Sequence, residues 1–177
     1  MTSVIDSVTF LAWESAVNMN ITIVCIGKLK EKYWRDAIAE YSKRLSSYCT
    51  LSICELKESR LASNPSAADE EAVKEAEGRE ILDHLKSSQY VVTLEVKGKR
   101  MTSEGLAARI AELTLDGTSD IAFVIGGSLG LSPEVSRRAN LKLSFSDMTF
   151  PHQMMRVILL EQIYRSFKIN RGEPYHK

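Results

Sequence analysis

The sequence contains little cysteine: Cys25, Cys49 and Cys54 are the only three in 177 residues. Their number is odd and no pair has CxxC spacing, which argues against a disulfide framework and against a zinc site. Cys25 lies in an apolar run typical of a buried strand. We therefore predict a cytoplasmic protein without a disulfide framework or a zinc site.

A long hydrophobic run is also absent. No apolar stretch approaches the ~20 residues that a membrane-spanning helix requires, so we predict no membrane partner. The first 18 residues lack the basic start of a signal peptide, and Asp6 and Glu14 interrupt any apolar centre. We interpret residues 1–18 as an extension that is disordered or arises from a start codon assigned too early, with a short amphipathic helix as the alternative. Residues 19–177 are predicted to form one domain.

Neither sign of charge is in excess. The chain has 23 lysines and arginines against 23 aspartates and glutamates, so no overall positive field indicates nucleic acid. The charges are unevenly placed, however: residues 28–44 are rich in lysine and arginine, residues 55–83 are acidic, and residues 165–177 are basic again. Two interpretations stay open, namely ordinary solvated helix faces or separate basic patches that together contact a polyanion.

What the sequence does contain is an alternation of two hydrophobic periods. Apolar β-branched or alternating runs predict strands at residues 21–26, 50–56, 90–96, 121–125 and 141–145. Helical spacing predicts helices at 31–47, 69–86, 102–115 and 151–168, with a short one after Ser132-Pro133-Glu134. This order predicts an α/β fold, with a mainly parallel sheet and helices on both faces.

Three local details complete the expected fold. Asp69 is the predicted N-cap of the second long helix. The segment Lys97-Gly98-Lys99 is expected to end the third strand. The last helix is expected to bury an inward face, made of Met154, Val157, Ile158 and Tyr164.

A glycine-rich loop follows the fourth predicted strand. Its sequence, Gly126-Gly127-Ser128-Leu129-Gly130, is not the dinucleotide pattern GxGxxG and has no P-loop lysine. It is either a tight structural turn or a ligand loop at the carboxyl end of a parallel strand. A nucleotide-dependent oxidoreductase is one function that such a loop would suit, and a non-enzymatic ribosome-associated protein is one that the basic patches would suit.

Ionisable side chains gather in the last third of the chain. Each has an ordinary explanation: His152 as a packing or capping residue, Arg165 as the ion-pair partner of Glu161, and Tyr175-His176-Lys177 as a frayed end. Together with Arg156 and the glycine loop, they instead indicate a site for proton transfer and anion contact.

These residues lie in sequence blocks that identify a family resemblance. The blocks are Gly27-Lys28-Leu29-Lys30-Glu31, Leu94-Glu95, Phe123 to Ser128, Leu143 to Val157, Leu160 to Arg165 and Tyr175-His176-Lys177. Over residues 19–177 the chain closely resembles the ribosomal RNA large subunit methyltransferase H family, of the SPOUT class.

The resemblance implies S-adenosylmethionine as methyl donor, and N3 of a pseudouridine in 23S rRNA as acceptor, in the large subunit or the assembled ribosome. It implies a deep C-terminal trefoil knot, an exception to unknotted topology. It also implies a homodimer whose two chains jointly form the substrate surface. The family's cofactor positions match Leu94, Gly126, Phe145, Ser146, Asp147, Met148, Thr149 and Phe150.

The resemblance also implies that no metal ion is needed, because the sulfonium centre already activates the methyl group. The enzyme must align donor and acceptor and help to remove the imide proton from N3. We expect His176 to be the base, because histidine titrates near neutral pH, with His152 as the next candidate. Tyr175 is the expected stacking or polar partner of the target base. Arg156 and Arg165 are expected to contact phosphate or stabilise developing charge.

Overall fold

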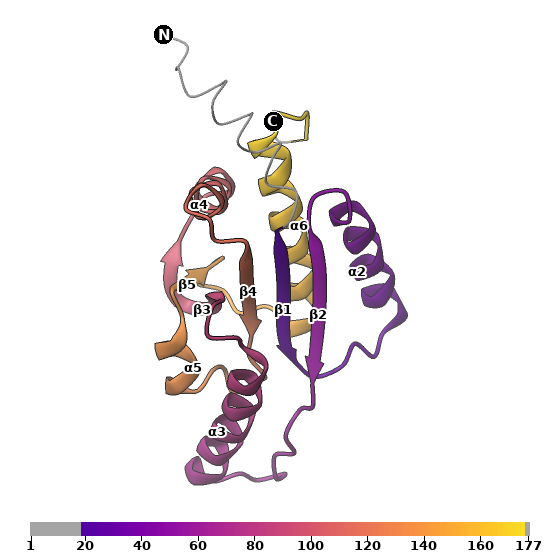
Figure 1. The fold of residues 1–177 in the computed structure, drawn as a ribbon. Helices are drawn as coiled ribbons and strands as arrows, with labels where there is room; N and C mark the ends of the chain where they lie inside the picture. The colour runs from indigo at the N-terminus through magenta and orange to yellow at the C-terminus, as the bar shows by residue number, and fades with distance from the viewer. Residues whose placement is uncertain (1–18, 176–177) are drawn as a thin grey trace.

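Parallel strands form the centre of the computed structural model, which describes residues 19–175. The strands are β1 (Asn20–Ile26), β2 (Thr50–Leu56), β3 (Tyr90–Arg100), β4 (Asp120–Ile125) and β5 (Leu141–Ser144). They lie in the order β2-β1-β4-β3-β5, and each neighbouring pair is parallel (Figure 1). The predicted parallel sheet is confirmed. The expectations for residues 1–18 and for His176 and Lys177 lie outside the described residues.

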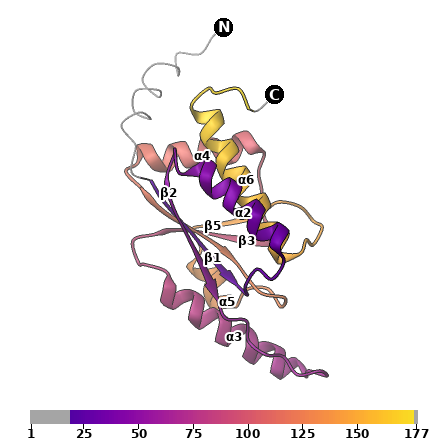
Figure 2. The ribbon, with the colours of Figure 1, turned by 90° about the vertical axis from the view of Figure 1, so that its right-hand side faces the viewer.

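Helices cover both faces of the sheet (Figure 2). One face carries α2 (Lys32–Leu45), α4 (Ser103–Leu115) and α6 (His152–Asn170), with α6 packed against both α2 and α4. The other carries α3 (Ala67–His84) and α5 (Pro133–Arg138). Successive β1 side chains enter the two cores in turn, because neighbouring residues of a strand point to opposite faces. The predicted α/β fold is therefore confirmed, while the knot stays a prediction.

Two predicted element ends are wrong. The N-cap of α3 is Ser66, not Asp69: the Ser66 side chain accepts from the Asp69 backbone N–H, and the Asp69 carboxylate accepts from the Ser66 backbone N–H. This reciprocal capping box starts the helix earlier than expected. Strand β3 continues past Lys97 because an irregularity between Leu94 and Lys99 lets it pair with β5 again.

The predicted inward face of α6 is confirmed only in part. Val157 and Tyr164 are half-buried and pack against the core, whereas Met154 and Ile158 are half-buried without being part of it. The fully buried apolar residues are instead Leu159, Leu160, Ile163 and Phe167. Because α6 is apolar on more than one side and is flanked by α2 and α4, its hydrophobic spacing does not select a single face.

Helix α6 runs against the strand direction. Near its start, Arg156 contacts the end of β1, and near its end Phe167 stacks on Tyr48, which precedes β2. The beginning of α6 therefore lies at the carboxyl edge of the sheet, and its end lies at the amino edge (Figure 1).

Candidate functional site

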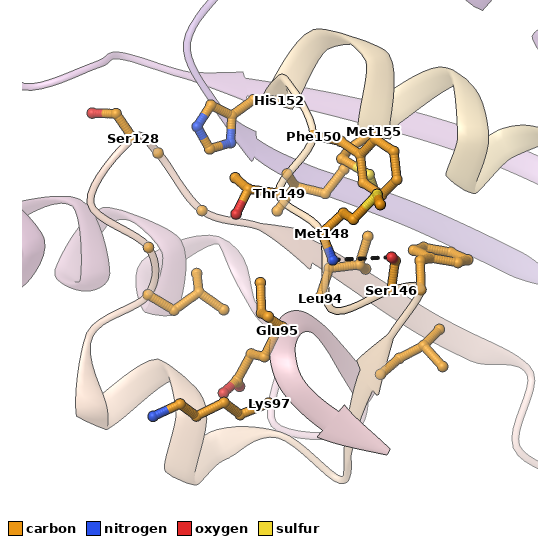
Figure 3. Close-up of a pocket in the computed structure, with 18 of the residues that line it drawn as sticks. Leu94, Glu95, Lys97, Ser128, Ser146, Met148, Thr149, Phe150, His152 and Met155 are labelled. Carbon is orange, nitrogen blue, oxygen red and sulfur yellow. Dashed lines mark hydrogen bonds between the residues drawn. The ribbon is translucent and has the colours of Figure 1, made fainter. Parts of the chain in front are cut away.

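A cavity of about 670 Å³ opens at the carboxyl ends of β3, β4 and β5. Open α/β sheets bind ligands at this edge, and the volume is typical of small-molecule sites. Three chain segments line it (Figure 3). They are Leu94 to Lys97; Ile125 to Leu131; and, from β5 into α6, Leu143, Phe145, Ser146, Met148, Thr149, Phe150, His152 and Met155.

The structure brings together the positions predicted to hold a cofactor. Seven of the eight line the cavity; the exception is Asp147, whose exposed carboxylate is paired with Arg100. Hydrogen bonds hold the part of these positions that lies after β5, residues 145–150. Ser144 Oγ donates to the carbonyl of Val96 at 2.9 Å, and the Met148 N–H donates to Ser146 Oγ at 3.0 Å. The end of β5 is thus tied to Val96 of β3, and the loop after it is held by a bond of its own.

The glycine loop is both a tight turn and a wall of the cavity. The Gly130 N–H donates to the Gly127 carbonyl at 3.0 Å, and Gly130 has a φ of 82°. A Cβ at Gly126 would lie 2.9 Å from the Gly130 carbonyl carbon, so a side chain there would push the turn apart. The two interpretations of this loop are therefore compatible.

Glu95 is a cavity residue that our site prediction missed. Thr93 Oγ1 donates to its Oε1 at 2.7 Å, and Ser136 Oγ donates to its Oε2 at 3.2 Å. These bonds hold a carboxylate at the cavity wall, and Lys97 lies two residues further along the same lining segment. Two signals were available: both residues follow the buried part of β3 at the carboxyl edge, and Glu95 belongs to the family block Leu94-Glu95.

His152 lines the cavity from the start of α6, and Figure 3 shows its ring between Ser128 and Thr149. Burial lowers the pKa of His152, and the nearby Arg156 charge lowers it further, while Glu58 opposes the shift. The imidazole is therefore neutral at pH 7 and able to accept a proton.

Arg156 does not line the cavity. Its Nη2 donates to the carbonyls of Ile26 and Gly27 at 2.7 and 2.8 Å, and its Nη1 donates to Glu55 Oε1 at 2.8 Å. The residue is 2% exposed. This guanidinium clamps α6 to the end of β1, and its predicted contact with substrate stays a prediction.

Arg165 and Tyr175 lie far from the cavity of their own chain. At ~1.5 Å per helical residue, Arg165 is roughly 20 Å along α6 from His152. Arg165 pairs with Glu161 at 2.7 Å, and its guanidinium carbon lies 4.8 Å from the centre of the Tyr175 ring. Tyr175 also packs edge-on against Tyr164 at 5.0 Å, so this residue is anchored and is not a frayed end.

The family model described as "Predicted SPOUT methyltransferase" matches residues 19–176. The chain belongs to the SPOUT methyltransferase family. Ribosomal RNA large subunit methyltransferase H of Clostridium novyi is 63% identical over 159 residues, which make up 90% of this chain and 100% of that protein. A protein of the same name from Bifidobacterium animalis subsp. lactis is 58% identical with the same coverage. The resemblance identified from the sequence is confirmed.

A solved structure described as "a probable methylase family protein from Haemophilus influenzae Rd KW20" shares the fold. Its TM-score is 0.51 at 14% sequence identity, covering 90% of this chain and 71% of that one.

Within residues 19–175, no helix is long and apolar enough to cross a membrane. The same residues contain no group of three or more His, Cys, Asp or Glu side chains placed to hold a metal ion.

Proposed function

We propose that this SPOUT methyltransferase uses S-adenosylmethionine to methylate N3 of a pseudouridine in 23S rRNA, and that it works as a homodimer. One observation carries the proposal: Leu94, Gly126 and the loop 145–150 meet around a single cavity. They do so in a chain that matches a protein named ribosomal RNA large subunit methyltransferase H over that protein's whole length.

The side chains around the cavity suit this cofactor. Leu94, Leu131, Phe145 and Phe150 provide apolar walls for an adenine ring. Glu95, held by Thr93 and Ser136, provides negative charge for a ligand that carries a sulfonium and an ammonium group. When bound, S-adenosylmethionine supplies an already activated methyl group, so the protein's task is to align the acceptor and take up its proton.

Two histidines are candidates for the proton acceptor. His152 lies in the cavity in neutral form, whereas His176 belongs to the C-terminal tail. Burial raises the pKa of Tyr175 to about 12, so its phenol stays protonated at neutral pH and acts as a donor or stacking surface. We keep His176 as the proposed base, with His152 as its rival.

The position of Tyr175 is the reason to propose a dimer with a shared site. Helix α6 separates Tyr175 and Arg165 from the cavity of their own chain, whereas a second chain can present both to it. Half-buried Met154 and Ile158 give α6 apolar surface close to the cavity, where a second chain could pack. In this arrangement each cavity would receive the tail of the partner.

Methyl transfer to defined RNA tests the proposal. Large subunits, assembled ribosomes and free 23S rRNA from a strain without this gene would be incubated with the protein and labelled S-adenosylmethionine. We expect one methyl group, mapped by mass spectrometry to N3 of a pseudouridine. A matched rRNA with uridine at that position should not be methylated. Methylation of the uridine form, or of a carbon atom, would contradict the proposed acceptor.

Calorimetry separates the rival functions. Binding of S-adenosylmethionine alone supports the proposal, and binding of NAD alone would support an oxidoreductase. RNA binding without either ligand would support a non-enzymatic ribosome-associated protein.

A further inference from the structure

The segment between β1 and α2 leaves the sheet beside the cavity. Cys25 pairs with Ile125, so Gly27 follows β1 at the level where Gly127 follows β4. The end of β1 lies close to the glycine loop, since a Cβ at Gly127 would be 3.2 Å from Cγ2 of Ile26. Arg156, next to the cavity residue Met155, holds the carbonyls of Ile26 and Gly27. The segment therefore starts at a fixed place at the cavity's edge.

Lys28 and Lys30 are exposed on this segment, and neither forms an ion pair with any of residues 19–175. Their backbone is nevertheless held in place. Arg35 Nη1 donates to the carbonyls of Leu29 and Lys30 at 3.3 and 2.7 Å. The Leu29 N–H donates to Glu55 Oε1 at 3.1 Å, the same oxygen that binds Arg156. Two unpaired ammonium groups thus extend from an ordered backbone.

An exposed aromatic ring stands next to these lysines. Tyr33 is 61% exposed in the first turn of α2, and its ring centre is 5.0 Å from that of Trp34. Lys32, in contrast, is paired with Asp36 at 2.6 Å. Exposed lysines by themselves are explained by an ordinary solvated helix face. That explanation does not cover an exposed tyrosine beside an ordered basic turn at the cavity's edge. Proteins that hold single-stranded RNA combine these two features, since ammonium groups bind phosphates and aromatic rings stack on bases.

We infer that Lys28, Lys30 and Tyr33, here named the basic-aromatic rim, contact single-stranded rRNA beside the target nucleotide. The inference rests on the proposed function and adds the place on this chain where the RNA lies. Lys28 and Lys30 bind phosphates, and Tyr33 stacks on an unpaired base. Because the chain has no net charge, a local rim of this kind supplies the attraction that an overall positive field would otherwise give.

RNA affinity and its dependence on salt test the rim. The variants are the double substitution Lys28→Gln with Lys30→Gln, Tyr33→Ala and Tyr33→Phe. Lys86→Gln is the matched control, because Lys86 is an exposed lysine that pairs with Asp120 at the amino edge of the sheet. For each full-length protein, affinity for the rRNA substrate, affinity for S-adenosylmethionine and methyl transfer would be measured.

The double variant should bind rRNA at least about tenfold more weakly at low salt. Its plot of log affinity against log salt should be shallower by about 1.4, because each phosphate contact to a single strand contributes about 0.7. Tyr33→Ala should weaken RNA binding about tenfold without changing that slope, and Tyr33→Phe should resemble the wild type. Cofactor affinity should be unchanged in all of them, and the control should match the wild type.

The outcomes separate this inference from the function on which it rests. Suppose that the wild type methylates rRNA and that the double variant keeps both its RNA affinity and its salt slope. The proposed role of the basic-aromatic rim is then wrong, and the proposed function is unaffected. If the double variant loses affinity for ribosomal subunits but not for free rRNA, the rim contacts a ribosomal protein, and the inference is again wrong. A wild type that transfers no methyl group to any rRNA overturns both.

Discussion

Arg156 and Glu55 form an ion pair of 2.8 Å that joins the start of α6 to the carboxyl edge of the sheet. The Arg156 side chain is 3% exposed and that of Glu55 is 30% exposed. Arg156 also binds the carbonyls of Ile26 and Gly27 at the end of β1, and His152, one helical turn earlier, lines the cavity. The pair therefore fixes a cavity wall as well as the fold.

Removing this arginine should destabilise the protein strongly. We expect Arg156→Met to lower the free energy of unfolding by about 3 kcal/mol, because one buried carbonyl, one half-buried carbonyl and a partly buried carboxylate lose their donor. Urea unfolding measures the change. Arg137→Met, which breaks an exposed pair with Glu134, is the control and should cost under about 1 kcal/mol. An Arg156→Met protein of normal stability but without activity would instead favour the predicted contact with substrate.

The lowered pKa of His152 has consequences for both stability and catalysis. Because the pKa in the folded state is below the ordinary 6.5, protonation favours the unfolded state. Wild-type stability should therefore fall, as the pH drops through 6.5 and below, more than that of His152→Gln. If His152 is the base, kcat/KM should also decline only below pH 6.5. The measurement is the free energy of unfolding and kcat/KM from about pH 5 to about pH 8, a range that brackets the pKa of an ordinary histidine. Identical pH profiles for wild type and His152→Gln would exclude His152 as the base.

The buried thiols should be unreactive in the native protein. Burial raises the pKa of Cys25 to about 11 and that of Cys49 to about 12, so neither forms a thiolate at pH 8. A thiol reagent should label the half-buried Cys54 at most, and all three cysteines after denaturation. In Cys54→Ser no native labelling should remain. Fast reaction of Cys25 or Cys49 would reveal local opening of the core.

A protein that starts at Met19 should fold and work normally. Met19 is 2% exposed, and its carbonyl accepts from the Thr50 N–H, so this residue is part of the core. The match to the family also begins there. We expect the melting temperature and activity to stay within error of the full chain. A loss of several degrees would show that residues 1–18 stabilise the domain.

The sequence predicts local patterns in this protein better than distant partners. The buried strands are evident because a parallel sheet covered on both faces needs continuous apolar runs, as in Ile121–Ile125. The resemblance supplied the cavity positions, of which Leu94 and Gly126 are far apart in the chain. No spacing rule, however, indicates that Arg156 pairs with Glu55, 101 residues away. The capping-box role of Asp69 was missed because Asp69 also suits an N-cap.

The distance between Tyr175 and the cavity could not be predicted from sequence either, since it depends on the direction in which α6 crosses the sheet. It leads to the sharpest test of a shared site. In Thr149→Trp, a large ring at an exposed lining residue should fill the cavity without disturbing the core. In His176→Ala, the proposed base is absent, and methyl transfer should fall by about 10²-fold. Each variant should be inactive alone, with dimer mass and melting temperature as controls for folding.

Mixing the two variants should restore activity if each cavity uses its partner's tail. After exchange of subunits at equal concentration, about half of the dimers combine one chain of each kind by random pairing. Each such dimer has one intact cavity that faces one intact tail, so about a quarter of wild-type activity should return, as measured by methyl transfer to rRNA. If each tail served its own cavity, every site in the mixture would lack one component and no activity would return. If the His176→Ala protein is active on its own, His176 is not the base. His152, which already lies in the cavity, then becomes the candidate.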